Sequence, residues 1–357
     1  MDSFTPPLSA NIAQLEPYKS GRSLLKGGEY VFMDAGESPF VPAYDRSGLP
    51  DINRYPDPTA DVLRDEIANL YGVERQQIIT TCGIDELIDL FIKAFVRSER
   101  SILTFSPTFP MFFFAAQVNN KRYISVQLRP DFSLDINALK TQWCEADILI
   151  LCTPNNPTGT TIELSDIREI LGSFPGLVVV DEAYGEYAKE MGMPSAIDLI
   201  RQGAENLLVC RTFSKAYRAA GIRLGYGIAS EKIIAALQKT KLPYNVNTLT
   251  QSIGIELLRD QKGMQQNVRT LQKESVRVQE ECRNLGCDVS KSITHFFLLA
   301  PPPNVETRMV YEKLRDTFAI AVRPYGVING KESLRINVGT PDQNTNFLLA
   351  LSTILSS

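Results

Sequence analysis

The chain of 357 residues contains a single histidine, His295. A zinc site built from several histidines is therefore excluded, and a Ser-His-Asp arrangement could use only this residue. His295 lies in a strand-like segment, where we expect a satisfied, partly buried histidine rather than a catalytic one. Proton transfer in an active site of this chain should then depend on another side chain, such as a lysine with a lowered pKa.

The six cysteines form no Cys-x-x-Cys pair. This spacing argues against a metal-thiolate site, and the placement of several cysteines in apolar runs favours a reducing compartment. No apolar run approaches the ~20 residues needed to span a bilayer. The first residues also lack the basic start and apolar centre of a secretory signal. We therefore expect a cytoplasmic protein without a metal.

Charge of one sign is not concentrated anywhere, since the formal net charge is -4 and no basic block occurs. Nucleic acids and anionic membranes are thus not expected as partners. The G-x-G-x-x-G fingerprint of dinucleotide-binding proteins is missing as well. The length and the hydrophobic content of 44% suit a globular protein with one large core and a smaller domain.

From about residue 57 to residue 229, short β-branched apolar runs alternate with helical patterns. Several runs are hydrophobic on both faces, as strands are when helices cover both sides of a sheet. The pattern predicts an α/β domain with a mainly parallel seven-stranded sheet. The expected strands are residues 78–81, 101–105, 123–127, 147–152, 177–181, 207–211 and 225–229, and the expected helices include 61–71, 85–96 and 164–172.

The last third of the chain has a different pattern, which predicts a smaller α+β domain. Residues 231–283 are expected to be helical, with an interruption near Pro243. Further strands are expected at 294–299, 319–323 and 333–338, and helices at 305–316 and 342–355. We predict an N-terminal segment, residues 1–40, that packs on the small domain. The large domain would comprise residues 41–245 and the small domain residues 246–357.

Lys215 follows an expected strand and lies among small hydroxyl residues. The hydroxyls of Thr212 and Ser214 and the guanidinium of Arg223 could hold a phosphate dianion close to the lysine amine. A Schiff-base lysine beside a phosphate clamp is what pyridoxal 5′-phosphate (PLP) requires. For Lys215 considered alone, a solvated surface position is the common alternative.

Four expected strands run into polar sequences, and ligands of parallel sheets bind at the carboxyl ends of strands. These sequences are Thr-Pro-Asn-Asn-Pro-Thr-Gly (153–159), Asp-Glu-Ala-Tyr (181–184), the Lys215 stretch, and Cys-Gly-Ile-Asp-Glu (82–86). We expect all four to converge on one edge of the sheet.

In this order, Asn-Asn-Pro-Thr-Gly, Asp-Glu-Ala-Tyr and Ser-Lys-Ala-Tyr followed by Arg223 resemble the fold-type I PLP aminotransferases, and among them the histidinol-phosphate aminotransferase family. The resemblance extends from about residue 17 to residue 339. It implies that Lys215 carries the cofactor and moves the substrate proton. It further implies that Asp181 pairs with the pyridinium nitrogen, and that Asn156 and Tyr184 hydrogen-bond the 3′-oxygen of the cofactor. Taken alone, Asp181 could be a helix cap and Asn156 a turn residue.

The resemblance places the cofactor phosphate at the start of the helix expected at 85–96, where free N–H groups and the helix dipole favour an anion. Its implied contacts are Gly83, Ile84, Asp85, Thr212, Ser214 and Arg223. Phe109 stands where the family stacks an aromatic ring on the cofactor, often a tyrosine. Tyr55 resembles the tyrosine that this family sends across a homodimer interface, although an ordinary interface or turn aromatic is the alternative.

For the substrate, the resemblance implies that Arg335 grips a carboxylate, that Arg323 helps to bind a phosphate, and that Tyr18 closes over the ligand. Solvated or structural roles are the alternatives for these three residues. The segment Ala35-Gly36-Glu37-Ser38-Pro39 departs from the Asn-Glu-Asn-Pro common in the family. This departure bears on the identity of the substrate more than on the cofactor.

The implied reaction is the exchange of amino groups between L-histidinol phosphate and 2-oxoglutarate, in histidine biosynthesis. It would follow ping-pong kinetics in a homodimer with shared active sites. Three alternatives remain open: an aromatic or aspartate-type aminotransferase, a threonine-phosphate decarboxylase of the same fold, and a non-enzymatic sensor or binding module. The sensor is disfavoured because the chain has no basic helical extension for DNA.

Overall fold

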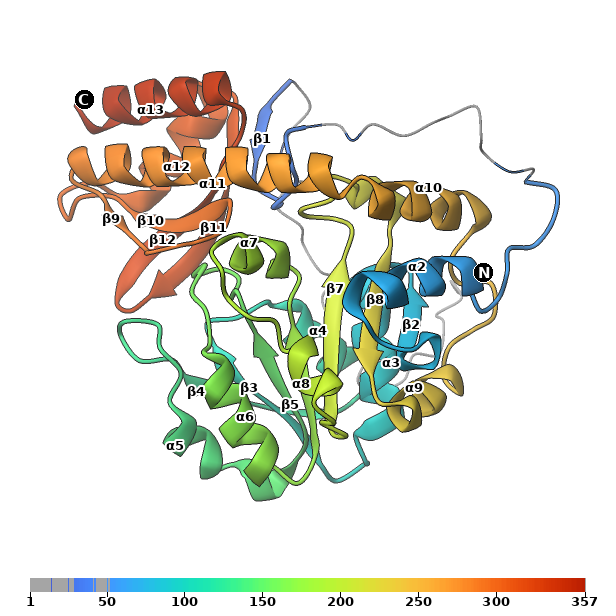
Figure 1. The fold of residues 1–357 in the computed structure, drawn as a ribbon. Helices are drawn as coiled ribbons and strands as arrows, with labels where there is room; N and C mark the ends of the chain where they lie inside the picture. The colour runs from blue at the N-terminus through green and yellow to red at the C-terminus, as the bar shows by residue number, and fades with distance from the viewer. Residues whose placement is uncertain are drawn as a thin grey trace, which may run out of the picture.

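The computed structural model describes residues 29–40 and 52–356, together with the single residues Gln14, Leu25, Pro42 and Pro50. Two sheets organise this part of the chain, and the smaller one lies above the larger one in Figure 1. None of the helices in the described part combines the length and the apolar character that crossing a bilayer requires.

The larger sheet has seven strands in the order β2-β8-β7-β6-β5-β3-β4. All neighbouring pairs from β7 to β4 are parallel, whereas β8 is antiparallel to both of its neighbours. The prediction of an α/β fold with a mainly parallel seven-stranded sheet is confirmed. The strands are β2 (Ile78–Thr81), β3 (Ser101–Ser106), β4 (Arg122–Gln127), β5 (Ala146–Cys152), β6 (Leu177–Asp181), β7 (Leu207–Thr212) and β8 (Gly225–Ala229).

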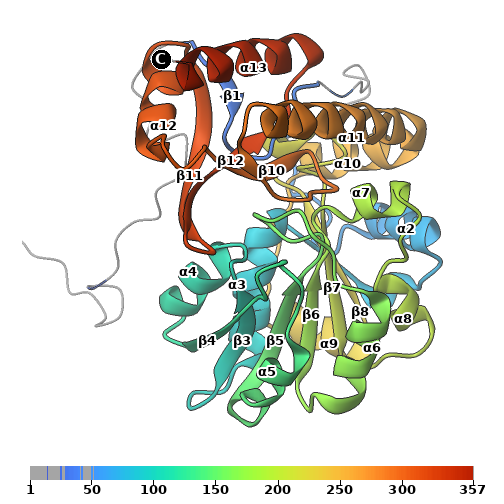
Figure 2. The same cartoon turned by 90° about the vertical axis from the view of Figure 1, so that its left-hand side faces the viewer.

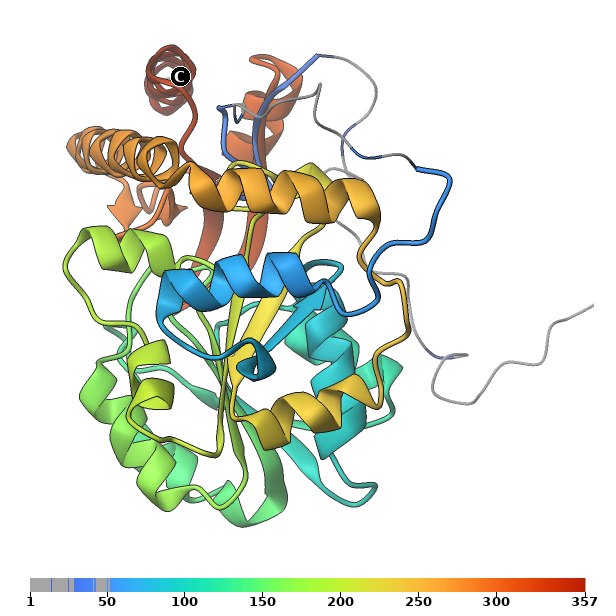
Figure 3. The same ribbon diagram turned by 45° about the vertical axis from the view of Figure 1, so that its right-hand side comes forward.

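Helices cover both faces of the larger sheet, with α3 and α9 on one side and α6 and α8 on the other (Figures 1 and 3). The central strands β5, β6 and β7 are therefore buried along their whole length, as their continuous apolar runs require. The helices of this part are α2 (Asp61–Tyr71), α3 (Gly83–Phe95), α4 (Met111–Val118), α5 (Ile136–Lys140), α6 (Leu164–Ser173), α7 (Gly185–Glu190), α8 (Ile197–Arg201) and α9 (Glu231–Gln238).

Helix α3 begins at Gly83, two residues before the predicted start at residue 85. The prediction was late because Asp85 and Glu86 occupy the first turn of the helix rather than the position before it. Acidic residues are favourable throughout this turn, since the free N–H groups carry partial positive charge. The backbone N–H groups of Gly83, Ile84 and Asp85 thus belong to the first turn, where no helical carbonyl precedes them.

The smaller sheet has the order β1-β11-β12-β10-β9. Helices α12 and α13 lie on its side away from the larger sheet (Figure 2). Its strands are β1 (Val31–Met33), β9 (Asp288–Val289), β10 (Phe296–Ala300), β11 (Ile320–Ile328) and β12 (Lys331–Asn337). The helices that follow α9 in the chain are α10 (Thr248–Arg259), α11 (Gln261–Asn284), α12 (Thr307–Asp316) and α13 (Pro341–Leu355).

Strand β10 begins two residues later than the predicted strand 294–299. The hydroxyls of Ser292 and Thr294 explain the difference, because they bond nearby backbone groups. The Ser292 hydroxyl accepts from the N–H of Thr294 at 3.1 Å, and the Thr294 hydroxyl donates to the carbonyl of Phe296 at 3.1 Å. Such local bonds compete with ladder formation.

Strand β1 connects the N-terminal part of the chain to the smaller sheet. It pairs in parallel with β11, and Val31 lies opposite Ile320. Most of the predicted N-terminal segment 1–40 lies outside the described residues. The residues that follow β1 form the segment from Asp34 to Gly36, which reaches the cavity described next.

Candidate active site

A cavity of about 660 Å³ lies where the ends of β5, β6 and β7 meet residues of β11 and β12. The structure brings most of the predicted site residues to its wall. The predicted residues that line it are Ile84, Asp85, Phe109, Asn156, Asp181, Tyr184, Thr212, Ser214, Lys215, Arg223, Arg323 and Arg335. The structure therefore confirms that these strand ends converge on one edge of the sheet.

Lys215 projects into the cavity from the loop that follows β7. Its Nζ donates a hydrogen bond to the carbonyl of Ala35 at 3.3 Å and lies 5.7 Å from the ring centroid of Tyr184. Burial, and then the positive charge of Arg335, lowers the pKa of the Lys215 amine to about 8. A substantial fraction of this amine is neutral near physiological pH, which is the form that attacks a carbonyl.

Asp181 ends β6 and is buried, with 3% of its surface exposed. Its carboxylate accepts the backbone N–H of Ala183 at 3.0 Å. It forms no ion pair with any of the described residues. Burial raises the pKa of this carboxyl to about 7. A cation placed beside Asp181 would stabilise its ionised form, so the site is suited to a ligand that carries a protonated nitrogen.

Asn156 and Tyr184 lie on the wall of the same cavity, and both are buried. Burial raises the pKa of the Tyr184 hydroxyl above its ordinary value, so this group remains a neutral hydrogen-bond donor. The Oδ1 of Asn156 accepts a hydrogen bond from Arg335. Both side chains can therefore serve as polar contacts for a bound ring substituent.

At one side of the cavity, the first turn of α3 lies against Arg223. A Cβ atom at Gly83 would lie 2.6 Å from Nη2 of Arg223, so only glycine permits this approach. Nη1 of Arg223 donates to the hydroxyl of Ser214 at 3.5 Å, and Nη2 is 3.3 Å from the carboxylate of Asp85. Thr212 lies beside Ser214, since its hydroxyl accepts the backbone N–H of Ser214 at 3.1 Å.

This group combines free helix N–H donors, two hydroxyls and a partly exposed guanidinium. Such a donor set matches a phosphate dianion. Gly83, a predicted contact, touches Arg223 although it is not itself part of the cavity wall.

On the opposite side, Arg323 and Arg335 face each other across the β11–β12 ladder as register partners. Both line the cavity. Arg335 has only 7% of its surface exposed; its Nη1 donates to Asn156 at 2.8 Å and its Nη2 to the carbonyl of Asp34 at 2.7 Å. Among the described residues no carboxylate pairs with Arg335. Its charge is thus available for an anionic ligand.

Of the other predicted residues, Tyr55 does not line this wall. Tyr18 lies outside the described residues. Tyr55 has 80% of its surface exposed and stacks on Tyr244, with ring centroids 4.6 Å apart. It does not line the cavity of its own chain, which is compatible with contact to a second subunit.

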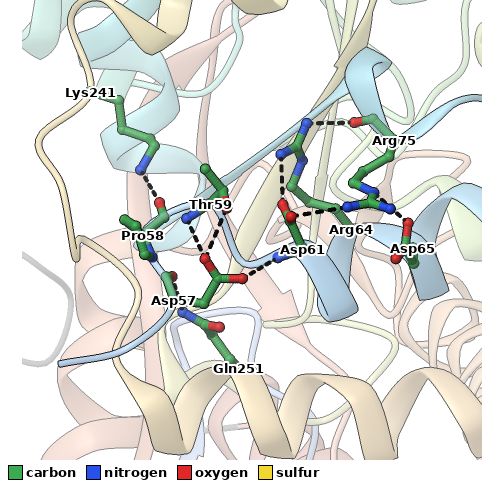
Figure 4. Close-up of polar contacts among 9 residues, drawn as sticks. All are labelled: Asp57, Pro58, Thr59, Asp61, Arg64, Asp65, Arg75, Lys241 and Gln251. Atoms are coloured by element: carbon green, nitrogen blue, oxygen red, sulfur yellow. Dashed lines mark hydrogen bonds and ion pairs between the residues drawn. The ribbon is translucent and has the colours of Figure 1, made fainter. Parts of the chain in front are cut away.

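The segment after Tyr55 is anchored to the body of the protein (Figure 4). The Asp57 carboxylate accepts the N–H groups of Thr59 and Asp61 at 3.0 and 2.7 Å. Lys241 donates to the carbonyl of Pro58 at 3.1 Å, and Gln251 donates to the carbonyl of Asp57 at 2.9 Å. These bonds hold the chain next to Tyr55 in a defined position at the surface.

The sequence analysis missed several contributors to the cavity wall, among them Asp34, Ala35 and Tyr325. Tyr325 lines it two positions after Arg323, and the period of two along a strand is a signal that could have identified it. Asp34 and Ala35 line it as well, through a loop whose position depends on the β1–β11 pairing.

Comparison with known proteins agrees with this geometry. The model of the class I and II aminotransferase family matches residues 42–351. A histidinol-phosphate aminotransferase of Parabacteroides distasonis is 37% identical over 348 residues, covering 96% of each chain. One of Bacteroides thetaiotaomicron is also 37% identical, over 346 residues and 96% of each chain.

A solved histidinol-phosphate aminotransferase of Sinorhizobium meliloti, in complex with pyridoxal-5′-phosphate, superposes with a TM-score of 0.89. It covers 99% of each chain at 23% identity, a level at which the likeness concerns the fold. The fold and the site thus define a transaminase. The chain belongs to the class I and II aminotransferases, and both relatives at 37% identity are named histidinol-phosphate aminotransferases. The predicted family and enzyme class are confirmed.

Proposed function

We propose that this chain is a PLP-dependent histidinol-phosphate aminotransferase. The observation that carries the proposal is the meeting of the Lys215 amine and the buried Asp181 carboxyl in one cavity, beside a set of phosphate-binding groups. The choice of histidinol phosphate as substrate is supported by the relatives, since both proteins at 37% identity are named histidinol-phosphate aminotransferases.

The residues present fit PLP at each of its polar groups. Asp181 is a buried carboxyl without a cationic partner among the described residues, which suits the pyridinium nitrogen. Arg223, Ser214 and the first turn of α3 suit the phosphate. Bound here, the cofactor would supply an electron sink for the charge that develops at the substrate Cα. Asn156 and Tyr184 would contact its 3′-oxygen and Phe109 one face of its ring.

Lys215 would bind the cofactor and then, once released, hold and transfer the proton at the substrate Cα. Its lowered pKa supports this role, because an amine with a pKa of about 8 can both lose and accept a proton under physiological conditions. Lys215 is half-buried, and its Nζ lies between the carbonyl of Ala35 and the ring of Tyr184.

Arg335 and Arg323 would bind the anionic groups of both substrates. Histidinol phosphate carries a phosphate and glutamate two carboxylates, so one site must accept either anion. Two guanidinium groups from adjacent strands can do so because each offers a planar fork of donors. Tyr18 remains a proposed contact with the substrate.

We also propose a cytoplasmic homodimer in which Tyr55 of each subunit reaches the cofactor phosphate bound by the other. Each subunit would have two domains, residues 41–245 and residues 246–357. The exposed and stacked ring of Tyr55 supports the dimer. Mixing inactive Lys215→Ala and weakened Tyr55→Ala subunits tests it. Heterodimers would regain one intact site, whereas a monomeric enzyme would regain no activity.

A half-reaction screen tests the proposed substrate. The PLP form would be mixed separately with histidinol phosphate, phenylalanine, aspartate and threonine phosphate, and conversion to the pyridoxamine form followed by absorbance. Histidinol phosphate should react fastest. If it is among the slowest donors, the substrate is wrong, and release of carbon dioxide from threonine phosphate would indicate the decarboxylase instead.

A further inference from the structure

Three successive carbonyl groups of the segment from Asp34 to Gly36 accept hydrogen bonds from side chains of the active site region. Arg335 donates to the carbonyl of Asp34 at 2.7 Å, and Lys215 donates to that of Ala35 at 3.3 Å. The third carbonyl, that of Gly36, lies 3.1 Å from Nε2 of His295. The first two donors belong to the site already described, but the third has no role in it.

His295 is fully buried and packs against aromatic rings. Its ring stacks on Tyr187 with centroids 4.9 Å apart and an interplanar angle of 24°, and Tyr184 lies 5.9 Å away. The charged groups that act on it are Lys215 and Arg335. Burial, and then the charge of Lys215, lowers the pKa of His295 to about 3, so the imidazole is neutral.

The tautomer follows from the hydrogen bond. A carbonyl oxygen can only accept, so Nε2 of a neutral His295 must carry the proton. Nδ1 then bears a lone pair, and it has no hydrogen-bond partner among the described residues. A ring that served only for packing at this position would not need nitrogen atoms. The bond to Gly36 is the one polar interaction of this ring that the structure describes.

Gly36 lies directly beside the reacting amine. Its φ is +66°, and a Cβ atom there would lie 3.0 Å from Nζ of Lys215 and 3.5 Å from the hydroxyl of Tyr184. A shift of the Gly36 peptide by a few tenths of an ångström would therefore change the space between the loop and the amine. The position of this peptide limits how a substrate Cα can approach Lys215.

We infer that His295 is a positioning residue for transamination, which acts by donating Nε2–H to the Gly36 carbonyl and so fixing the loop over the Lys215 amine. The inference rests on the proposed function, because it assigns a role to His295 in the same reaction. It concerns orientation of the substrate and not binding of the cofactor.

Because the chain has one histidine, an imidazole nitrogen spectrum contains the signals of His295 alone. Holoenzyme labelled with ¹⁵N-histidine, and made without a polyhistidine tag, should show one neutral imidazole protonated at Nε2. Its signals should remain unchanged from pH 5 to pH 9. A proton on Nδ1, or an imidazolium at pH 7, would overturn the inference without reference to activity.

Variants test the consequence for the reaction. His295→Phe keeps a ring against Tyr187 but lacks the donor, whereas His295→Gln retains an N–H at similar reach. The maximal half-reaction rate with histidinol phosphate should fall at least roughly tenfold in His295→Phe, the effect of losing one buried hydrogen bond. It should recover to within about threefold in His295→Gln. The dissociation constant of PLP should stay within about twofold, since the bond does not touch the cofactor site.

Tyr187→Phe is the matched control, because it keeps the stacked ring and removes a hydroxyl without a partner among the described residues. Equal rates in the Phe and Gln variants of His295 would overturn the inference. If the parental enzyme converts none of the amino donors, the proposed function fails instead. The nitrogen spectrum would still report on the bond to Gly36.

Discussion

Nη1 of Arg335 donates a hydrogen bond of 2.8 Å to Oδ1 of Asn156, although the two residues are 179 positions apart. The bond joins β12 of the smaller sheet to the loop after β5 of the larger sheet. It links the residue proposed to bind the substrate anion to a residue proposed to contact the cofactor. The guanidinium is nearly buried and lacks a carboxylate partner among the described residues.

Replacing Arg335 by Gln keeps a donor for Asn156 and removes the positive charge. We expect the half-saturating concentration of glutamate in the half-reaction to rise roughly 30-fold or more, as for loss of one partner from a buried charged pair. Stopped-flow absorbance measures it. Arg168→Gln, on the exposed face of α6, is the control and should behave as the parental enzyme. An unchanged glutamate dependence in Arg335→Gln would remove this arginine from the substrate site.

Asp181→Asn should stabilise the cofactor-free protein at higher pH and lower the activity of the enzyme with PLP bound. In the cofactor-free protein, the pKa of Asp181 is about 7, above the ordinary carboxyl value of 3.8. Folded protein thus keeps a proton that unfolded protein releases, so the free energy of unfolding falls as pH rises between these values. Asparagine does not titrate, so the substitution removes this pH-dependent part of the free energy of unfolding, which is at most about 4 kcal/mol.

Urea denaturation of both cofactor-free proteins should show the Asn variant gaining stability relative to the parent between pH 4 and pH 8. With PLP bound, the same variant should lose about 100-fold to 1,000-fold in kcat, because the ring nitrogen loses its carboxylate. Equal stability differences at both pH values would contradict the assigned burial of the charge.

The pH dependence of cofactor capture tests the environment of Lys215. Only a neutral amine reacts with an aldehyde, so the rate at which cofactor-free protein incorporates PLP should rise with pH. Its midpoint should lie near the pKa of about 8. In Arg335→Gln the midpoint should move upward, since a neighbouring positive charge is lost. A midpoint near 10.5 in the parental protein would indicate an ordinary solvated lysine.

Gly36→Ala tests the crowding around the amine separately from backbone strain. The new Cβ would lie 3.0 Å from Nζ of Lys215, at a φ of +66°. Gly192→Ala is the matched control, because Gly192 has a φ of +76° but nothing within 4 Å of its Cβ position. Both variants should lose about 1 kcal/mol of stability from left-handed strain. Only Gly36→Ala should slow the half-reaction, and equal rates in both would refute the proposed contact.

The sequence was sufficient to predict what depends on neighbours along the chain. The apolar runs located the seven strands, and the rule that ligands bind at strand ends brought Asp181 and Lys215 to one edge. The start of α3 was misplaced by two residues, because acidic residues are favourable anywhere in a first turn.

Contacts between distant segments could not be predicted in this way. The bond from His295 to Gly36 spans 259 positions and depends on the pairing of β1 with β11. His295 was expected to be satisfied and partly buried, but it is fully buried and its Nδ1 has no partner among the described residues. Periodicity identifies which residues are buried, and it contains no information on which distant carbonyl a buried donor will meet.

The central claim is that the amine of Lys215 carries the cofactor. The most direct measurement is borohydride reduction of the PLP-loaded protein, followed by digestion and mass spectrometry. We predict one modified peptide, with the added mass of the reduced cofactor on Lys215, and unmodified exposed lysines such as Lys232. Modification of another lysine with Lys215 unmodified would contradict the account.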